Sequence, residues 1–207
     1  MFLSSRKELL GDINKIVVKI GTTSINQDEG KLSPGFLDSI ASQVFTLHNS
    51  GKKVVIVSSG SIGLGVDVLD LDSRPREIPV RQAAAAVGQS MLMQEWSKAF
   101  SKYGLKVAQL LLTYESFSNR LTYLNLRNSM HTLLSYGVIP IINENDPICV
   151  HEIEATFGDN DKLSAMVASK TEADLLIILS DIDGLYDKNP HNNHGAKLLH
   201  LVEEITP

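Results

Sequence analysis

Five short apolar runs, most of them rich in β-branched residues, recur along the chain. They lie at residues Lys15–Ile20, 54–57, 107–112, 138–142 and 175–179. Runs of this length without polar alternation predict strands that are buried on both faces, as in a parallel sheet.

Segments with a helical pattern separate these runs, and capping residues mark their ends. Ser33 and Pro34 are suited to the start of a helix that ends near Gly51. Further helices are predicted at residues 79–103, 119–136 and 159–171. Buried strands that alternate with helices predict an α/β fold, a three-layer αβα sandwich with an open, mostly parallel sheet.

The pattern favours one domain over residues 1–207, since no repeat or linker interrupts it. One polar segment, residues 147–157, has no helical period, and we expect it to form a hairpin flap. In a parallel sheet of this class, ligands bind outside the carboxyl ends of the strands, so the residues that follow each strand are the candidates for function.

Composition and charge exclude several classes of protein. The formal net charge is -5, and no basic patch stands out, so we expect no nucleic-acid partner. No uncharged apolar run approaches the ~18 residues of a membrane span, and the first residues lack the apolar core of a signal peptide. The one cysteine, Cys149, allows no intramolecular disulfide. We therefore expect a cytoplasmic protein without membrane contact.

The first two strands are followed by turns that suit an anion. Lys19 comes near the end of the first strand, with Gly21 and Thr22 after it. This arrangement fits either a phosphate site or an ordinary glycine turn. Ser59 and Gly60 belong to a Gly/Ser-rich turn after the second strand, which fits an anion site at a helix N-terminus or close packing that requires glycine.

The later strand ends carry acids and amides. The sequence Asn-Glu-Asn-Asp ends at Asp146 and suits an ammonium group, a metal or a simple turn. Asn160 and Asp161 stand where a helix begins. They fit either ordinary N-cap residues or residues with a function in the site. Ser180 and Asp181 open a segment that lacks the full spacing of a calcium loop and more plausibly lines a nucleotide site.

Taken in order, these motifs resemble the amino-acid kinase family, and within it the glutamate kinase branch. The stretches that carry the resemblance are VVKIGTTSI, VVIVSSGSIGLG, AAVGQSMLMQ, AQLLLT, RNSMHTLL, VIPIINENDPI, GDNDKLSAMVA and LLIILSDIDGLYDKNP. They cover nearly all of residues 15–204. The resemblance implies ATP-dependent phosphorylation of the γ-carboxylate of L-glutamate to glutamyl 5-phosphate, the first step of proline biosynthesis.

The resemblance to these transferases also implies roles for single residues, which would be catalytic, would bind the substrate or would bind the nucleotide. Lys19 and Asp161 would be catalytic, Asp161 by orienting the lysine. The substrate residues would be Ser59, Gly60, Asp146 and Asn160, and the nucleotide residues would be Lys19, Gly21, Thr22, Ser180 and Asp181. ATP and Mg²⁺ would be the cofactors. No residue is assigned as a metal ligand, because Mg²⁺ would be held mainly by the nucleotide phosphates.

Partners and alternatives follow from the same resemblance. It implies L-glutamate and ATP as substrates, feedback inhibition by proline and a homo-oligomer. A Gly-rich stretch with a second lysine, which the family domain carries further along, does not occur in this sequence, so we expect the kinase domain to be incomplete at its C-terminal side. A non-catalytic module that binds glutamate or a nucleotide, and another small-molecule kinase of the family, are the alternatives.

Overall fold

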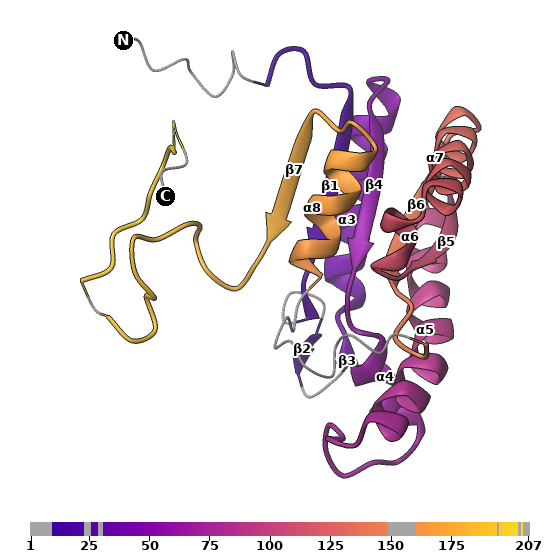
Figure 1. Ribbon diagram of the computed structural model, residues 1–207, viewed down its shortest axis with the longest axis vertical. Coiled ribbons are helices and arrows are strands. Elements are labelled where there is room, and N and C mark those ends of the chain that lie inside the picture. The colour runs from indigo at the N-terminus through magenta and orange to yellow at the C-terminus, as the bar shows by residue number, and fades with distance from the viewer. Residues whose placement is uncertain are drawn as a thin grey trace.

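A single parallel sheet forms the centre of the molecule. The computed structural model describes residues 10–22, 26–28, 31–148, 160–193, 195–202 and 204. The sheet has the strand order β5-β6-β4-β1-β7, and every neighbouring pair is parallel. Its strands are β1 (Lys15–Ile20), β4 (Lys53–Ser58), β5 (Lys106–Leu112), β6 (Val138–Glu144) and β7 (Leu175–Leu179). All five predicted strands are confirmed (Figure 1).

Helices cover both faces of this sheet, which confirms the three-layer prediction (Figure 1). On one face lie α3 (Pro34–Asn49) and α5 (Ile78–Ser101), and on the other lie α6 (Glu115–Ser118), α7 (Arg120–Ser135) and α8 (Asp161–Lys170). Successive residues of β1 alternate between the two apolar clusters: Ile16 and Val18 pack toward α3 and α5, whereas Val17 packs toward α8. This alternation is what makes the strands apolar on both faces.

The predicted helix ends agree with the structure to within about two residues. Ser33 caps α3 by accepting a hydrogen bond from the Phe36 amide at 3.3 Å, and Gly51 follows the helix with a φ of 82°. Asn119 caps α7 in the same way, with Thr122 N donating to its Oδ1 at 3.0 Å. The capping residues in the sequence therefore define where these helices begin.

Three elements were not predicted: the short α6, which precedes α7, and β2 (Asn26–Asp28) and β3 (Lys31–Leu32), which pair in a separate antiparallel hairpin. The helix N-terminus expected at the Gly/Ser-rich turn belongs to α4 (Ser61–Val68), whose extent was not predicted. Conversely, most of the predicted flap at 147–157 lies outside the described residues. No helix in the described part of the chain is both long and apolar enough to cross a membrane.

The helices α4 and α5 meet backbone to backbone. A Cβ atom added to Gly65 would lie 1.8 Å from the carbonyl oxygen of Ala84, and one added to Gly88 would lie 1.8 Å from that of Ser61. No side chain larger than hydrogen fits at these two positions. Close packing thus explains two glycines of the motif-bearing segments, and it brings the start of α4 against the middle of α5.

Candidate functional site

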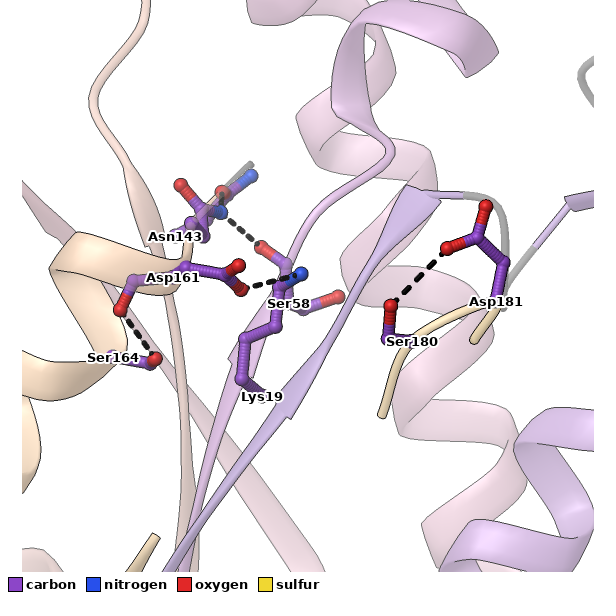
Figure 2. Close-up of polar contacts among 8 residues, drawn as sticks. Lys19, Ser58, Asn143, Asp161, Ser164, Ser180 and Asp181 are labelled. Atoms are coloured by element: carbon purple, nitrogen blue, oxygen red, sulfur yellow. Dashed lines mark hydrogen bonds and ion pairs between the residues drawn. The ribbon is translucent and has the colours of Figure 1, made fainter. Parts of the chain in front are cut away.

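A buried lysine marks the carboxyl end of β1. Lys19 is 1% exposed, and its Nζ lies 2.8 Å from Oδ1 of Asp161, the first residue of α8 (Figure 2). The side chain of Asp161 is 55% exposed. The stem of the lysine therefore lies in the core, while its charge is held beside an acid that solvent reaches.

The turn after β4 has a fixed shape. Gly60 adopts a φ of 109°, and α4 starts at Ser61 without any side-chain cap for its first amides. Trp96 Nε1 donates to Ser58 Oγ at 3.0 Å, and Ser58 Oγ donates to the carbonyl oxygen of Ser59 at 3.2 Å. An uncapped helix N-terminus in a rigid turn attracts an anion through its amides and its dipole. Both readings of the Gly/Ser motif, anion site and close packing, are therefore compatible with the structure.

Side-chain amides connect this turn to β6 and α8. Asn160 Nδ2 donates to the carbonyl oxygen of Ser58 at 2.9 Å and to Asn143 Oδ1 at 2.7 Å. Asn143 Nδ2 donates to Gln89 Oε1 at 2.7 Å. Asn143 and Gln89 are buried, so these bonds hold the ends of β4 and β6 and the start of α8 in one arrangement. Figure 2 shows Ser58, Asn143 and Asp161 close together at these ends.

Asp146 is a partly buried carboxyl group that faces the start of α4. Ser61 Oγ donates to its Oδ2 at 3.2 Å. Burial, followed by the nearby charge of Glu144, raises the pKa of Asp146 to about 6, and the Ser61 hydrogen bond, Arg81 and Arg74 oppose this rise. A carboxylate that is poorly solvated in this way gains from binding a cation such as an ammonium group.

The expected nucleotide residues follow the neighbouring strands β1 and β7. Gly21 is buried and Thr22 partly buried after β1, while Ser180 and Asp181 are exposed after β7. The last residues of these two strands are paired in register, so the four positions lie at adjacent strand ends. Ser180 Oγ donates to Asp181 Oδ1 at 3.1 Å, and Figure 2 shows this pair apart from Lys19 and Asp161.

The structure thus gathers the candidate residues into two neighbouring groups. In the first, an ion pair, hydrogen bonds and direct chain connections link the residues around the ends of β1, β4 and β6, namely Lys19, Ser59, Gly60, Asp146, Asn160 and Asp161. The second consists of the four positions that follow β1 and β7. No group of three or more His, Cys, Asp or Glu side chains suited to a metal ion occurs among the described residues.

Sequence reasoning missed the residues beneath the site. Gln89 and Trp96 were not expected to take part, and Ser61 and Asn143 were seen only as parts of the Gly/Ser-rich and polar motifs. The available signal was Gln89 itself, a polar residue on the buried stripe of α5 that includes Ala85, Leu92 and Trp96. A glutamine at a buried helix position requires a polar partner.

Comparison with known proteins agrees with this architecture. The model of the Amino acid kinase family matches residues 14–206. The chain is 72% identical over 205 residues to a glutamate 5-kinase of Methanococcoides burtonii and 63% identical over 212 residues to one of Methanosarcina mazei, covering 99% of the chain and 55% of each relative. A glutamate 5-kinase of Clostridium acetobutylicum is 47% identical over 203 residues, 98% of the chain and 75% of that relative.

The chain therefore spans about half the length of the first two of these relatives. The match to the family model extends over nearly all of the chain, including every strand of the sheet and both groups of candidate residues. The chain belongs to the amino acid kinase family.

Proposed function

We propose that this chain catalyses the ATP-dependent phosphorylation of the γ-carboxylate of L-glutamate, which forms glutamyl 5-phosphate in the first step of proline biosynthesis. The observation that carries the proposal is the buried Lys19, whose ammonium group pairs with Asp161 beside the uncapped start of α4. The ammonium group of Lys19 and the N-terminal end of the α4 dipole each supply positive potential at this edge of the sheet. Relatives named glutamate 5-kinase support the choice of acceptor.

The reaction needs little proton chemistry. A γ-carboxylate has a reference pKa near ~4.3, so it is ionised at neutral pH and requires no general base. The demand is to align the acceptor oxygen with the γ-phosphorus of ATP and to neutralise charge on the phosphoryl group as it moves. Lys19 supplies a positive charge for that group, and Asp161 orients the lysine.

The acceptor amino acid would bind between the ends of β4 and β6. Asp146 would take its ammonium group, and the turn with Ser59 and Gly60 would take a carboxylate through backbone amides. Asn160 would complete this group of contacts, because its side chain already bonds to the carbonyl oxygen of the residue before Ser59.

The nucleotide would occupy the adjacent strand ends. Gly21 and Thr22 would approach the phosphates together with Lys19, and Ser180 and Asp181 would line the remainder of the nucleotide site. Mg²⁺, when bound, neutralises charge on the phosphates that hold it. Exposed Asp161 and Asp181 carboxylates fit a site near such an ion, although neither is assigned as its ligand.

The same proposal covers partners and location. L-glutamate and ATP would be the substrates, proline a feedback inhibitor, a homo-oligomer the assembly and the cytoplasm the location. The net charge of -5 supports the absence of a nucleic-acid partner. Titration of activity with proline tests the feedback inhibition, and sedimentation of the purified chain tests the homo-oligomer.

The deciding experiment traps the acyl phosphate product. The chain is incubated with ATP, Mg²⁺, hydroxylamine and one acceptor, with the Methanococcoides burtonii relative as positive control. Hydroxamate that forms with L-glutamate, and not with L-aspartate or N-acetyl-L-glutamate, supports the proposal. Binding of L-glutamate without turnover would identify a non-catalytic module, and a clear preference for another acceptor would identify a different small-molecule kinase.

A further inference from the structure

Gln89 is a buried amide that the proposed reaction does not use. Its side chain belongs to α5 and is 7% exposed, on the stripe of the helix that faces the sheet. Oε1 accepts a hydrogen bond from Asn143 Nδ2 at 2.7 Å. Nε2 is buried and has no hydrogen-bond partner among the described residues. The unsatisfied Nε2 is a cost that an apolar side chain of the same shape would avoid, so packing alone does not account for a glutamine here, whereas the hydrogen bond from Asn143 does.

The direction of the hydrogen bonds around Gln89 is fixed by the backbone. The Glu144 amide donates to Asn143 Oδ1 at 2.9 Å, and Asn160 Nδ2 donates both to the Ser58 carbonyl oxygen at 2.9 Å and to Asn143 Oδ1. A backbone amide can only donate and a carbonyl can only accept. Asn143 must therefore present Nδ2 to α5, where Gln89 meets it with an oxygen.

This directed chain ends at both parts of the acceptor site. Asn160 directly precedes Asp161, the partner of Lys19. On the other side, Asn143 Nδ2 also donates to Ser61 Oγ at 3.4 Å, and Ser61 Oγ donates to Asp146. The orientation of one amide, that of Asn143, thus influences both groups of contacts.

We infer that Gln89 is a positioning residue: by accepting the hydrogen bond from Asn143 Nδ2, it secures the orientation that the Glu144 amide sets for the Asn143 side chain, and this orientation keeps Asn160 against the turn after β4 and Ser61 against Asp146. The inference rests on the proposed function for its link to L-glutamate. The hydrogen-bond geometry itself is a property of the protein without ligand, so it can be tested separately.

The first test uses the side-chain amide resonances of the ligand-free protein. In the wild type, the Asn143 side-chain amide protons exchange with solvent at least about tenfold more slowly than those of exposed Asn125, because they are buried and bonded. Exchange as fast as that of Asn125 would overturn the inference, and this measurement does not depend on whether any variant folds.

The second test replaces Gln89 by methionine, which keeps the length of the side chain and removes both polar atoms. Gln89→Met is expected to shift the side-chain resonances of Asn143 and Asn160, whereas Gln94→Met, at an exposed position of the same helix, leaves them unchanged. Unchanged resonances in folded Gln89→Met would show that the glutamine positions nothing.

The third test measures binding. Gln89→Met is expected to raise the dissociation constant for L-glutamate about tenfold and to change that for ATP less than about twofold. Equal losses for both ligands, or none, would overturn the link between Gln89 and the acceptor site. If the wild type itself does not bind L-glutamate, the proposed function fails, and the resonances still decide whether Gln89 positions Asn143.

Discussion

Two ionisable side chains of the site are shielded from solvent. Lys19 lies in the core at 1% exposure with its ammonium group beside Asp161, and Asp146 is a partly buried carboxyl group whose pKa is raised by burial and by Glu144. Ionisable groups placed in this way are characteristic of sites that bind charged molecules. The effect of each residue on stability and its effect on function can be measured separately.

For Lys19 we expect activity to fall without a matching loss of stability. Lys19→Met should lower the rate of hydroxamate formation by about 10²–10³-fold, because one positive charge at the moving phosphoryl group is lost. The free energy of unfolding should change by less than about 1 kcal/mol, since methionine fills the space and the remaining Asp161 is solvated. Urea unfolding and the hydroxamate assay measure the two effects.

Lys53→Met is the matched control, since Lys53 is exposed at the amino end of β4. It should leave the rate unchanged. A Lys19→Met protein that remains folded and turns over L-glutamate at the wild-type rate would remove Lys19 from the mechanism.

For Asp146 the pKa of about 6 predicts a specific dependence of stability on pH. Because the folded protein holds the proton more tightly than the unfolded chain does, stability decreases as pH rises from about 4 to 6 and the loss is complete above that range. A rise of about two pKa units corresponds to up to about 3 kcal/mol. Asp146→Asn should therefore stabilise the ligand-free protein by up to about 3 kcal/mol at pH 7.5, and by about half of that at pH 5.

Urea unfolding of both proteins at the two pH values tests this expectation, with L-glutamate binding measured alongside. The wild type should lose affinity for L-glutamate below about pH 6 as Asp146 takes up a proton. An equal stability of Asp146→Asn and wild type at both pH values would show that this carboxyl group titrates normally.

At the scale of elements, regular features were predictable and contacts between distant elements were not. The strands of the sheet follow from apolar runs, and the starts of α3 and α7 follow from Ser33 and Asn119. The Gly/Ser-rich turn indicated the start of α4 but not its extent, because the glycines of α4 disfavour a helix locally and its packing on α5 compensates for them. The strand ends were the right places to look for the site, but the order of the strands and the partner of Gln89 depend on long-range packing, which a local pattern does not contain.

The contact between α4 and α5 predicts a strong effect of a single methyl group. Gly65→Ala should lower the free energy of unfolding by about 3 kcal/mol or more, because the added Cβ would lie 1.8 Å from a backbone oxygen. For a domain of this size the melting temperature should fall by about 6–12 °C. Gly35→Ala is the control, since nothing lies within 4 Å of a Cβ at that helical position. Equal melting temperatures for the two variants would contradict the close approach of the helices.

At the scale of the whole molecule, the described chain divides into a layered body and an extended segment after β7. Figure 1 shows this segment leaving the sheet and running away from the helices. Most of its residues are exposed, among them Leu185 at 60%, and an antiparallel bridge between Tyr186 and Leu198 holds it locally. Backbone with so few packed contacts opens more readily than the layers do.

Limited proteolysis should reveal this division. Among the described lysines and arginines, we expect trypsin to cut first at Lys188, which is exposed within the segment, and to spare those in helices and strands such as Lys98 and Lys106. Mass spectrometry of the first products identifies the cut. An initial cut between residues 31 and 148 would mean that the layered body is the less stable part.

The chain contains one tryptophan, and its position gives the protein a built-in optical reporter. Trp96 is fully buried, and its indole nitrogen is bonded to Ser58, the residue that leads into the turn proposed to receive the acceptor. Any rearrangement of that turn alters the surroundings of a single fluorophore. Intrinsic emission should therefore follow occupancy of the acceptor site in real time, without a label and without turnover.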